Sequence, residues 1–125
     1  MVKTVMVIDD EPDLREMLTI LLRSHDYNVV GAANGKEALK ILKNLEKKPD
    51  LVLVDMFMPE MSGREVCESI RNDAQLKNLK LAFLTVAAFG GYGKQMLKEL
   101  DILDYILKPY DIDDLMRRID RMLEK

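Results

Sequence analysis

Residues 5–10 read Val5-Met6-Val7-Ile8-Asp9-Asp10, a run of four apolar residues that ends on two carboxylates. Three further apolar runs also end on a residue that can contact a phosphoryl group. These are Leu51-Val52-Leu53-Val54 before Asp55, Leu81-Ala82-Phe83-Leu84 before Thr85, and Tyr105-Ile106-Leu107 before Lys108-Pro109. Short apolar runs bounded by polar residues are typical of buried parallel strands. Because an open α/β sheet binds ligands beyond the carboxyl ends of its strands, we expect these polar groups to gather at one edge.

Helix-like segments alternate with strand-like segments along the whole chain. The predicted strands cover residues 4–8, 28–32, 51–54, 80–84 and 103–107. The predicted helices begin at Pro12, after the caps Asn34 and Ser62, near residue 94, and at Asp111 or Asp113. Proline suits a first helical turn, and Asn34 followed by Glu37 resembles a capping box. Strict alternation predicts an α/β fold with a parallel sheet covered by helices on both faces.

Composition narrows the class of protein. The chain has 125 residues, of which 48% are hydrophobic and 33% charged, as in one soluble globular domain. Its net charge of −3 and scattered basic residues give no basic stripe, so we expect no direct binding to nucleic acid. No apolar stretch approaches the roughly 20 residues of a membrane span, so we expect no membrane insertion.

The two ends of the chain and its single cysteine suggest where the protein works. Cys67 cannot form an internal disulfide, and Met1-Val2-Lys3 leads into a strand rather than a signal peptide. We therefore expect a cytoplasmic protein. The last predicted helix reaches the end of the chain, so we expect one domain over residues 1–125 with no effector domain.

Asp9, Asp10 and Asp55 are predicted to crowd at neighbouring strand ends. Like charges raise each other's pKa unless a cation compensates, and Mg²⁺ is a hard cation that prefers oxygen ligands. A carboxylate can also accept a phosphoryl group, in a transfer that needs positioning and charge neutralisation. Lys108 would supply positive charge, and the Thr85 hydroxyl can donate to a phosphoryl oxygen. The competing interpretation, carboxylates that merely cap helices or loops, suits a single aspartate better than this set.

Taken together, these stretches resemble the receiver domain of two-component response regulators over residues 3–124. The matching stretches are Val7-Ile8-Asp9-Asp10-Glu11-Pro12, Leu53-Val54-Asp55-Met56-Phe57-Met58-Pro59-Glu60-Met61-Ser62-Gly63, Phe83-Leu84-Thr85 and Asp104-Tyr105-Ile106-Leu107-Lys108-Pro109-Tyr110. The resemblance implies a flavodoxin-like (βα)5 fold, a doubly wound parallel sheet with strand order 2-1-3-4-5. It also implies a stand-alone regulator similar to those of chemotaxis.

The resemblance implies a Mg²⁺-dependent phosphoacceptor site. Asp55 is the implied phosphoacceptor and a metal ligand, Asp10 binds Mg²⁺ directly, and Asp9 binds it through water. The backbone carbonyl of Phe57 is a further implied metal ligand. Lys108 is the implied contact of the phosphoryl group, next to a cis peptide bond that proline makes accessible.

The resemblance also implies partners and an output surface. A histidine kinase or a phosphotransfer protein would donate the phosphoryl group, and an unknown downstream protein would read the result. Thr85 and Tyr105 are the implied switch pair, and the fourth helix, fifth strand and fifth helix are the implied output surface. Candidate positions on this surface are Lys94, Lys98, Tyr105, Asp114 and Arg118.

Three apolar residues near the predicted site depart from the family pattern. Val86 follows Thr85 where the family usually has a small residue. Phe57 and Ala87 occupy positions that, by resemblance, tune the hydrolysis of the phosphoryl group, and neither can position water. We therefore expect slow hydrolysis, with simple packing at the rim as the alternative.

Two further departures concern the backbone. Asp101-Ile102 replaces the usual Gly-Ala before the last strand, and aspartate tolerates the left-handed conformation better than most residues. The glycine-rich stretch Phe89-Gly90-Gly91-Tyr92-Gly93 predicts a long mobile loop and a short fourth helix.

Three other functions are alternatives to a switch. A phosphorelay intermediate would pass the phosphoryl group on to a histidine phosphotransfer protein, which the sequence leaves open. An Asp-nucleophile phosphatase of the haloacid dehalogenase type needs a second aspartate where this chain has Phe57. A nucleotide or flavin module is disfavoured because the acidic loop over residues 9–13 would repel phosphate. We predict a switch rather than an enzyme, one that catalyses only its own phosphorylation and dephosphorylation.

Overall fold

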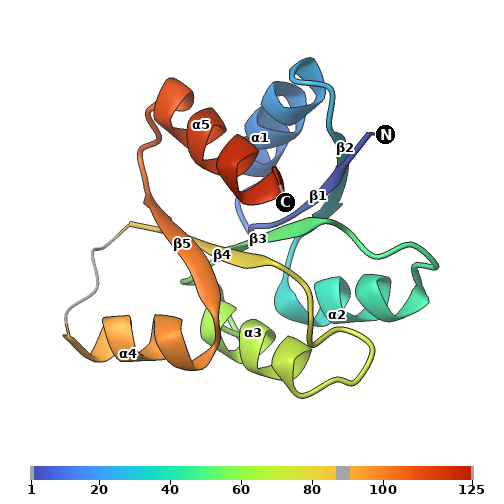
Figure 1. The fold of residues 1–125 in the computed structure, drawn as a ribbon, viewed down its shortest axis with the longest axis vertical. Coiled ribbons are helices and arrows are strands. Elements are labelled where there is room, and N and C mark those ends of the chain that lie inside the picture. The colour runs from blue at the N-terminus through green and yellow to red at the C-terminus, as the bar shows by residue number, and fades with distance from the viewer. Residues whose placement is uncertain (1, 87–90, 125) are drawn as a thin grey trace.

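The computed structural model describes residues 2–86 and 91–124 of the chain. Its centre is a five-stranded parallel sheet with the strand order β2-β1-β3-β4-β5 (Figure 1). The strands are β1 (Thr4–Ile8), β2 (Asn28–Ala32), β3 (Leu51–Asp55), β4 (Leu81–Thr85) and β5 (Ile102–Leu107). The helices are α1 (Pro12–Ser24), α2 (Gly35–Asn44), α3 (Gly63–Arg71), α4 (Gly91–Glu99) and α5 (Ile112–Leu123). The predicted flavodoxin-like fold and its strand order are confirmed.

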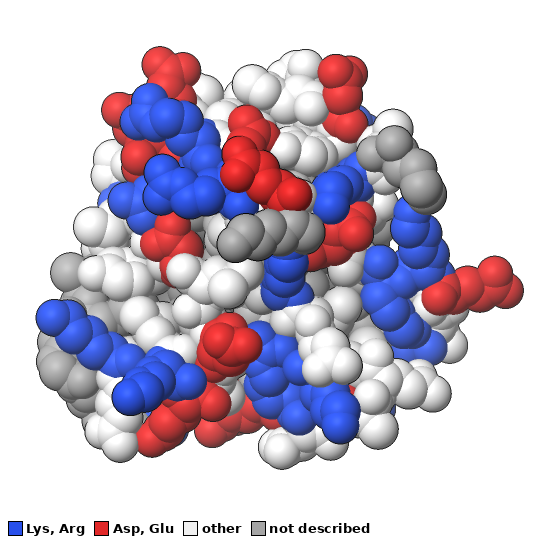
Figure 2. Space-filling view, viewed as in Figure 1, with Lys and Arg blue, Asp and Glu red and all other residues white. Residues whose placement is uncertain are grey.

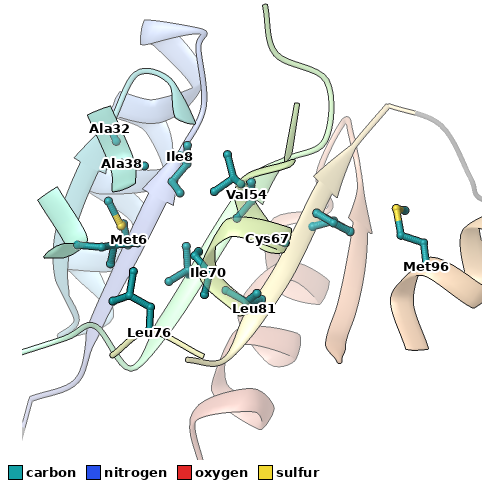
Figure 3. Packing of buried hydrophobic residues seen from close by; sticks show 14 residues of the cluster. Met6, Ile8, Ala32, Ala38, Val54, Cys67, Ile70, Leu76, Leu81 and Met96 are labelled. Carbon is teal, nitrogen blue, oxygen red and sulfur yellow. The ribbon is translucent and has the colours of Figure 1, made fainter. Parts of the chain in front are cut away.

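Helices cover both faces of the sheet, with α1 and α5 on one face and α2, α3 and α4 on the other (Figure 1). Every residue of β3 is buried because this central strand has a helical layer on each side. Alternate side chains therefore enter two separate cores. Figure 3 shows one of them, in which Met6 and Val54 from the sheet meet Cys67 and Ile70 from α3.

Side-chain caps mark where α2, α3 and α5 begin. Ser62 and Glu65 form a full capping box at the start of α3. The Asn34 Oδ1 atom accepts a hydrogen bond from the Glu37 backbone N–H at 2.8 Å. Asp111, rather than Asp113, caps α5 by accepting from the Asp114 backbone N–H at 3.1 Å. Each cap satisfies a backbone donor that the helix itself leaves without a partner.

The fourth helix begins earlier than its sequence predicted. It starts at Gly91 rather than near residue 94, so Gly91 and Gly93 lie in its first turn. Helix propensity is a weak guide that tertiary packing overrides, and α4 buries Met96 against the sheet. The helix is short, with nine residues, as predicted. The predicted mobile loop falls largely on residues 87–90, which lie outside the described part of the chain.

Asp101 holds the turn between α4 and β5 in the left-handed conformation, with φ of 53°. The predicted tolerance of aspartate for this position is confirmed. The Arg71 guanidinium closes on the same turn from α3: it donates to the carbonyl oxygens of Leu100 at 2.7 Å and Asp101 at 3.1 Å. It also donates to those of Lys77 and Leu79, both at 2.7 Å. We call this set of four hydrogen bonds the Arg71 clamp.

Among the helices in the described part of the chain, none is both long enough and apolar enough to span a membrane.

Candidate functional site

The carboxyl ends of four strands bring the predicted site residues to one edge of the sheet. In the strand register Ile8 pairs with Val54, Asp55 with Leu84, and Thr85 with Leu107. Asp9 follows β1 directly and starts at the same level of the sheet as Asp55. Lys108 follows β5 directly and starts slightly beyond that level, because Asp55 is level with Leu84 and Ile106. Parallel pairing alone therefore gathers the groups that the sequence marks.

Asp9, Asp10 and Asp55 form the acidic centre of this edge. Each contributes one carboxylate oxygen, and these oxygens all lie within 4.8 Å of one another. Asp9 and Asp55 are buried, whereas Asp10 is half-buried. A compact set of three carboxylate oxygens is the kind of donor set that Mg²⁺ prefers. The role of the Phe57 carbonyl as a metal ligand remains a prediction. The backbone N–H of Phe57 donates to Asp55 Oδ1 at 3.2 Å.

Lys108 is the cation of the site. Its Nζ lies 3.1 Å from Asp9 Oδ2, 3.5 Å from Asp55 Oδ2 and 3.8 Å from Glu11 Oε1. Burial lowers the pKa of Lys108, but the hydrogen bond to Asp9 and the charges of Asp55 and Glu11 outweigh burial and raise the pKa overall. The ammonium group thus stays charged beside the carboxylates. The peptide bond that follows it, Lys108-Pro109, is cis, as the resemblance implies.

Asp55 has a strongly perturbed acidity. Burial is the main cause and raises the pKa of its carboxyl from 3.8 to about 6, and the charges of Asp9 and Asp10 add smaller increases. Lys108 and the Phe57 backbone N–H lower the pKa but do not cancel the effect of burial. The sequence predicted an increase from like charges, whereas desolvation contributes more.

This pKa predicts how the Asp55→Asn substitution changes stability without a divalent cation. An acid with a raised folded-state pKa costs stability above that pKa, and the cost vanishes as the pH falls to the unfolded-state value. We expect the variant to gain on the order of 2 kcal/mol in free energy of unfolding at pH 8. Below pH about 6 the gain should shrink, reaching nearly zero by 3.8. Urea unfolding between pH 3.8 and pH 8 measures this difference in the free energy of unfolding. The exposed Asp13→Asn variant is the control. A gain in stability that does not depend on pH would contradict the prediction.

Thr85 and Tyr105 occupy neighbouring strands. Thr85 is fully buried at the end of β4, and its carbonyl oxygen accepts a hydrogen bond from the Lys108 backbone N–H at 2.7 Å. Tyr105 pairs with Phe83 and packs, half-buried, against the core beneath α3 and α4. The two residues of the predicted switch pair therefore sit on adjacent strands, with the threonine directly at the acidic edge.

A tight loop connects Asp55 to α3. The Gly63 backbone N–H donates to the Met56 carbonyl oxygen at 3.0 Å and closes the loop. A Cβ atom on Gly63 would lie 2.4 Å from the Asp55 carbonyl oxygen, so only glycine fits at this approach. Glu60, near the tip, adopts the left-handed conformation with φ of 67°. The start of α3 thus rests directly against the backbone of the candidate acceptor.

Two apolar side chains border the acidic edge and face solvent. Phe57 is 56% exposed and Val86 is 67% exposed, so neither is held in a core. Ala87, the third residue predicted to influence hydrolysis, lies outside the described residues. The high exposure leaves both side chains available to cover the space above Asp55.

The structure adds residues that the sequence did not assign to the site. Glu11 faces Lys108, and its backbone N–H donates to Asp9 Oδ1 at 2.9 Å. Arg15 Nη1 donates to the Asp9 carbonyl oxygen at 2.7 Å.

The buried Tyr110 hydroxyl has no hydrogen-bond partner within residues 2–86 and 91–124. Burial, and then the charges of Asp9, Asp55 and Glu11, raise the Tyr110 pKa. Glu11 and Tyr110 belong to the stretches that carry the family resemblance, and this membership was the available signal for both residues.

Comparison with known proteins gives this arrangement a family. The DNA-binding response regulator MtrA of Mycolicibacterium smegmatis is 32% identical over 121 residues, which are 97% of this chain and 50% of MtrA. Histidine kinase P4 of Formosa agariphila is 35% identical over 121 residues, or 8% of its length. The chain thus spans about half the length of the curated relatives it matches, or less.

Solved structures agree in fold. The chemotaxis protein CheY4 of Vibrio cholerae superposes with a TM-score of 0.89 at 28% identity, covering 98% of this chain and 100% of that one. The response regulator TrrA of Thermotoga maritima, solved in complex with Mg(2+)-BeF, has a TM-score of 0.80 at 34% identity, with 98% and 100% covered. The model of the response regulator receiver domain matches residues 5–120, and the chain belongs to that family.

Proposed function

We propose that this chain accepts a phosphoryl group on Asp55 from a phosphohistidine of a histidine kinase or a phosphotransfer protein. The observation that carries the proposal is the contact of Lys108 Nζ with Asp55 Oδ2 at 3.5 Å, inside a cluster of three carboxylates. An aspartate nucleophile, a buried lysine and a hydroxyl at one sheet edge suit phosphoryl transfer to a carboxylate. Cytoplasmic placement, where such kinases act, belongs to the same proposal.

The chain's own groups account for the transfer. A carboxylate oxygen of Asp55 forms a bond to phosphorus while the phosphorus–nitrogen bond to the donor imidazole breaks, and the nitrogen keeps the bonding electron pair. The Phe57 backbone N–H, 3.2 Å from Asp55 Oδ1, orients the carboxylate. Lys108 balances negative charge on the phosphoryl oxygens, and the Thr85 hydroxyl donates to one of them.

A divalent cation fits the donor set. Asp9, Asp10 and Asp55 would hold Mg²⁺, with the Phe57 carbonyl as the proposed further ligand. When bound, Mg²⁺ would neutralise charge on the carboxylates and the incoming phosphoryl group. The cost of burying the Asp55 carboxylate, visible in its raised pKa, falls when such a cation is present.

The proposal is tested by incubating the protein with a small-molecule phosphodonor and Mg²⁺, followed by intact mass measurement and site mapping. We expect one added phosphoryl group, mapped to Asp55, which is lost at alkaline pH as an acyl phosphate. No added mass with any of several phosphodonors, or a modification mapped to another residue, would overturn the proposal.

We propose a signalling switch rather than an enzyme acting on other substrates, with output through α4, β5 and α5. Arg118 Nη1 binds both Asp104 carboxylate oxygens, at 2.8 and 3.0 Å, and its Nε binds Asp114 Oδ2 at 2.9 Å, joining β5 to α5. These residues and Tyr105 line a cavity of about 460 Å³. Lys94 and Lys98 are exposed on α4. An unknown downstream protein would bind this surface.

Amide NMR can test the proposed output surface. A stable phosphoryl mimic should draw the Thr85 hydroxyl toward Asp55 and open space for the Tyr105 ring, shifting a population between two arrangements. We expect chemical shift changes through residues 85–108, including β5 next to Tyr105. Thr85→Ala should reduce the changes in β5 severalfold while the mimic still binds. Changes confined to the rim of Asp55 would contradict this prediction.

The exposed apolar rim predicts a long-lived phosphoryl group. Val86→Ala should speed labelling by small phosphodonors several-fold because it opens access to Asp55. Phe57→Gln should speed loss of the label because a polar side chain can orient water. We expect about a tenfold effect, below the roughly 10²–10⁴-fold of full general acid–base catalysis. Time courses of labelling and decay measure both. Exposed Ile20→Ala, far along α1, serves as the control, and unchanged rates in both rim variants would leave only a packing role.

A phosphorelay intermediate is the second candidate. Its support is that one relative is a histidine kinase in which the matched segment is only a small part of the protein. Mixing the phosphorylated chain with a histidine phosphotransfer protein would show rapid, reversible transfer if the chain is an intermediate.

A further inference from the structure

A groove between α2 and the loop after β3 is separate from the acidic edge and from the α4–β5–α5 surface. It has a volume of about 610 Å³ and is lined by Lys36, Leu39, Lys40, Lys43, Glu60 and Met61. We call it the α2 groove. Leu39 and Met61 are half-buried and form its apolar floor, whereas the other four side chains are exposed. The groove thus combines an apolar base with a charged border.

The three lysines of the groove form a stripe. Their spacing, at 36, 40 and 43, places them on one side of α2, since residues three and four apart are neighbours on a helix. Within the described residues none of the three ammonium groups has a carboxylate within ion-pair distance or a hydrogen-bond partner. Nearby Lys48, in contrast, donates to the Leu42 and Leu45 carbonyl oxygens at the carboxyl end of α2. Figure 2 shows basic and acidic side chains interspersed over the face in view.

The floor of the groove packs closely against the start of α2. A Cβ atom on Gly35 would lie 2.8 Å from Met61 Sδ and 2.6 Å from a Val66 methyl group, so Met61 is packed tightly against the start of α2. Met61 in turn sits in the closed loop whose Glu60 has φ of 67°. A preformed floor lowers the entropic cost of binding a partner.

We propose that the α2 groove binds an acidic amphipathic helix of a partner protein. Such a helix would place apolar side chains on Leu39 and Met61, and carboxylates opposite Lys36, Lys40 and Lys43. A helix in a groove is a recurring mode of peptide recognition, read by apolar side chains three and four residues apart. α2 itself has ten residues, so a helix of about ten residues is enough to lie along it.

Two other anionic occupants fit less well. A single-stranded nucleic-acid site combines basic residues with aromatic side chains that stack on bases. Among the residues that the structure describes, no aromatic side chain lines the α2 groove. A membrane surface is bound by protruding apolar residues, whereas Leu39 and Met61 lie recessed between charged side chains. Both occupants are kept as outcomes of the test.

The test uses a small set of synthetic acidic amphipathic helices of about 14 residues, each with leucine at every third or fourth position. Shuffled peptides of the same composition are the first control. We expect saturable amide shift changes in residues 36–43 and 59–61, with a dissociation constant below about 1 mM, and no such changes with shuffled peptides. Binding should weaken as ionic strength rises.

Matched charge-reversal variants decide whether the groove is responsible. The triple variant Lys36→Glu, Lys40→Glu, Lys43→Glu should bind about tenfold more weakly or worse, since three exposed pairs become repulsive. The triple variant Lys3→Glu, Arg23→Glu, Lys77→Glu carries the same net charge and should bind within about twofold of the native chain. The groove lysines, Arg23 and Lys77 are exposed and Lys3 is half-buried, and the circular dichroism of each variant checks its fold.

Three results would overturn the proposal. One is no saturable shift with any peptide of the set, and another is equal weakening by the two triple variants. The third is stronger binding of duplex DNA or of vesicles containing anionic lipid at residues 36–43. Phosphorylation of Asp55 can succeed or fail independently of all three, so the groove and the proposed function are tested separately.

Discussion

Asp55→Asn is expected to abolish phosphorylation by small phosphodonors and by a histidine kinase, lowering the labelling rate by about 10²-fold or more. Asparagine has nearly the same shape as aspartate but has an amide where the nucleophilic carboxylate oxygen was. The Phe57 backbone N–H can still donate to the remaining carbonyl oxygen, so the local backbone should be retained. Loss of labelling in a folded variant would therefore identify the nucleophile rather than a damaged site.

Quantitative mass spectrometry with site mapping measures this result. Asp50→Asn is a control of a different kind, because Asp50 precedes the same strand and accepts a hydrogen bond from the Thr4 backbone N–H at 2.8 Å. That variant should be labelled at close to the native rate, even if it is less stable. Stoichiometric labelling of the Asp55→Asn protein at another residue would contradict the assignment.

Asp10→Ala is expected to remove most Mg²⁺ binding and, with it, phosphorylation. Asp10 is the half-buried member of the acidic cluster, and its loss leaves two carboxylates for the cation. We expect Mg²⁺ affinity to fall by about 100-fold, at least as much as losses of outer-shell ligand partners cause. Without the cation, the same substitution should raise the free energy of unfolding by on the order of 1 kcal/mol, because it relieves repulsion among like charges.

Isothermal titration with Mg²⁺, labelling with and without chelator, and urea unfolding measure the three effects. Asp13→Ala removes a carboxylate three residues along the chain, on the exposed first turn of α1. It should leave Mg²⁺ affinity within about twofold, since surface charges are screened. A labelling rate that chelation does not change would disprove the metal role for the whole cluster.

Much of this fold was predictable because its strands and caps are local signals. The apolar runs before Asp55 and Thr85 gave the buried strands, and Ser62 and Asn34 marked two helix starts. The edge that gathers Asp9, Asp55 and Lys108 followed from parallel pairing, which needs no distances. The flavodoxin-like strand order came from the family resemblance, not from the periodicity of the residues.

The features that the sequence did not predict depend on contacts between segments that are distant in the sequence. From the sequence, crowding of carboxylates was the predicted cause of the raised pKa of Asp55. Burial contributes more, and it depends on both helical layers, which only the folded structure shows. Gly91 and Gly93 favour a loop by propensity, yet α4 includes them while Met96 packs on the sheet. Glu11 and Lys108 are close in space but separated by most of the sequence, so no local pattern predicts their contact.

The Arg71 clamp has a mechanical consequence for the proposed output. It fastens the carbonyls of Leu100 and Asp101, at the carboxyl end of α4, to those of Lys77 and Leu79 just ahead of β4. The acidic edge lies at the opposite end of these strands. We expect a displacement of α4 that begins near Thr85 to pivot about this fixed end, with the largest movement at Gly91 and almost none at Leu100.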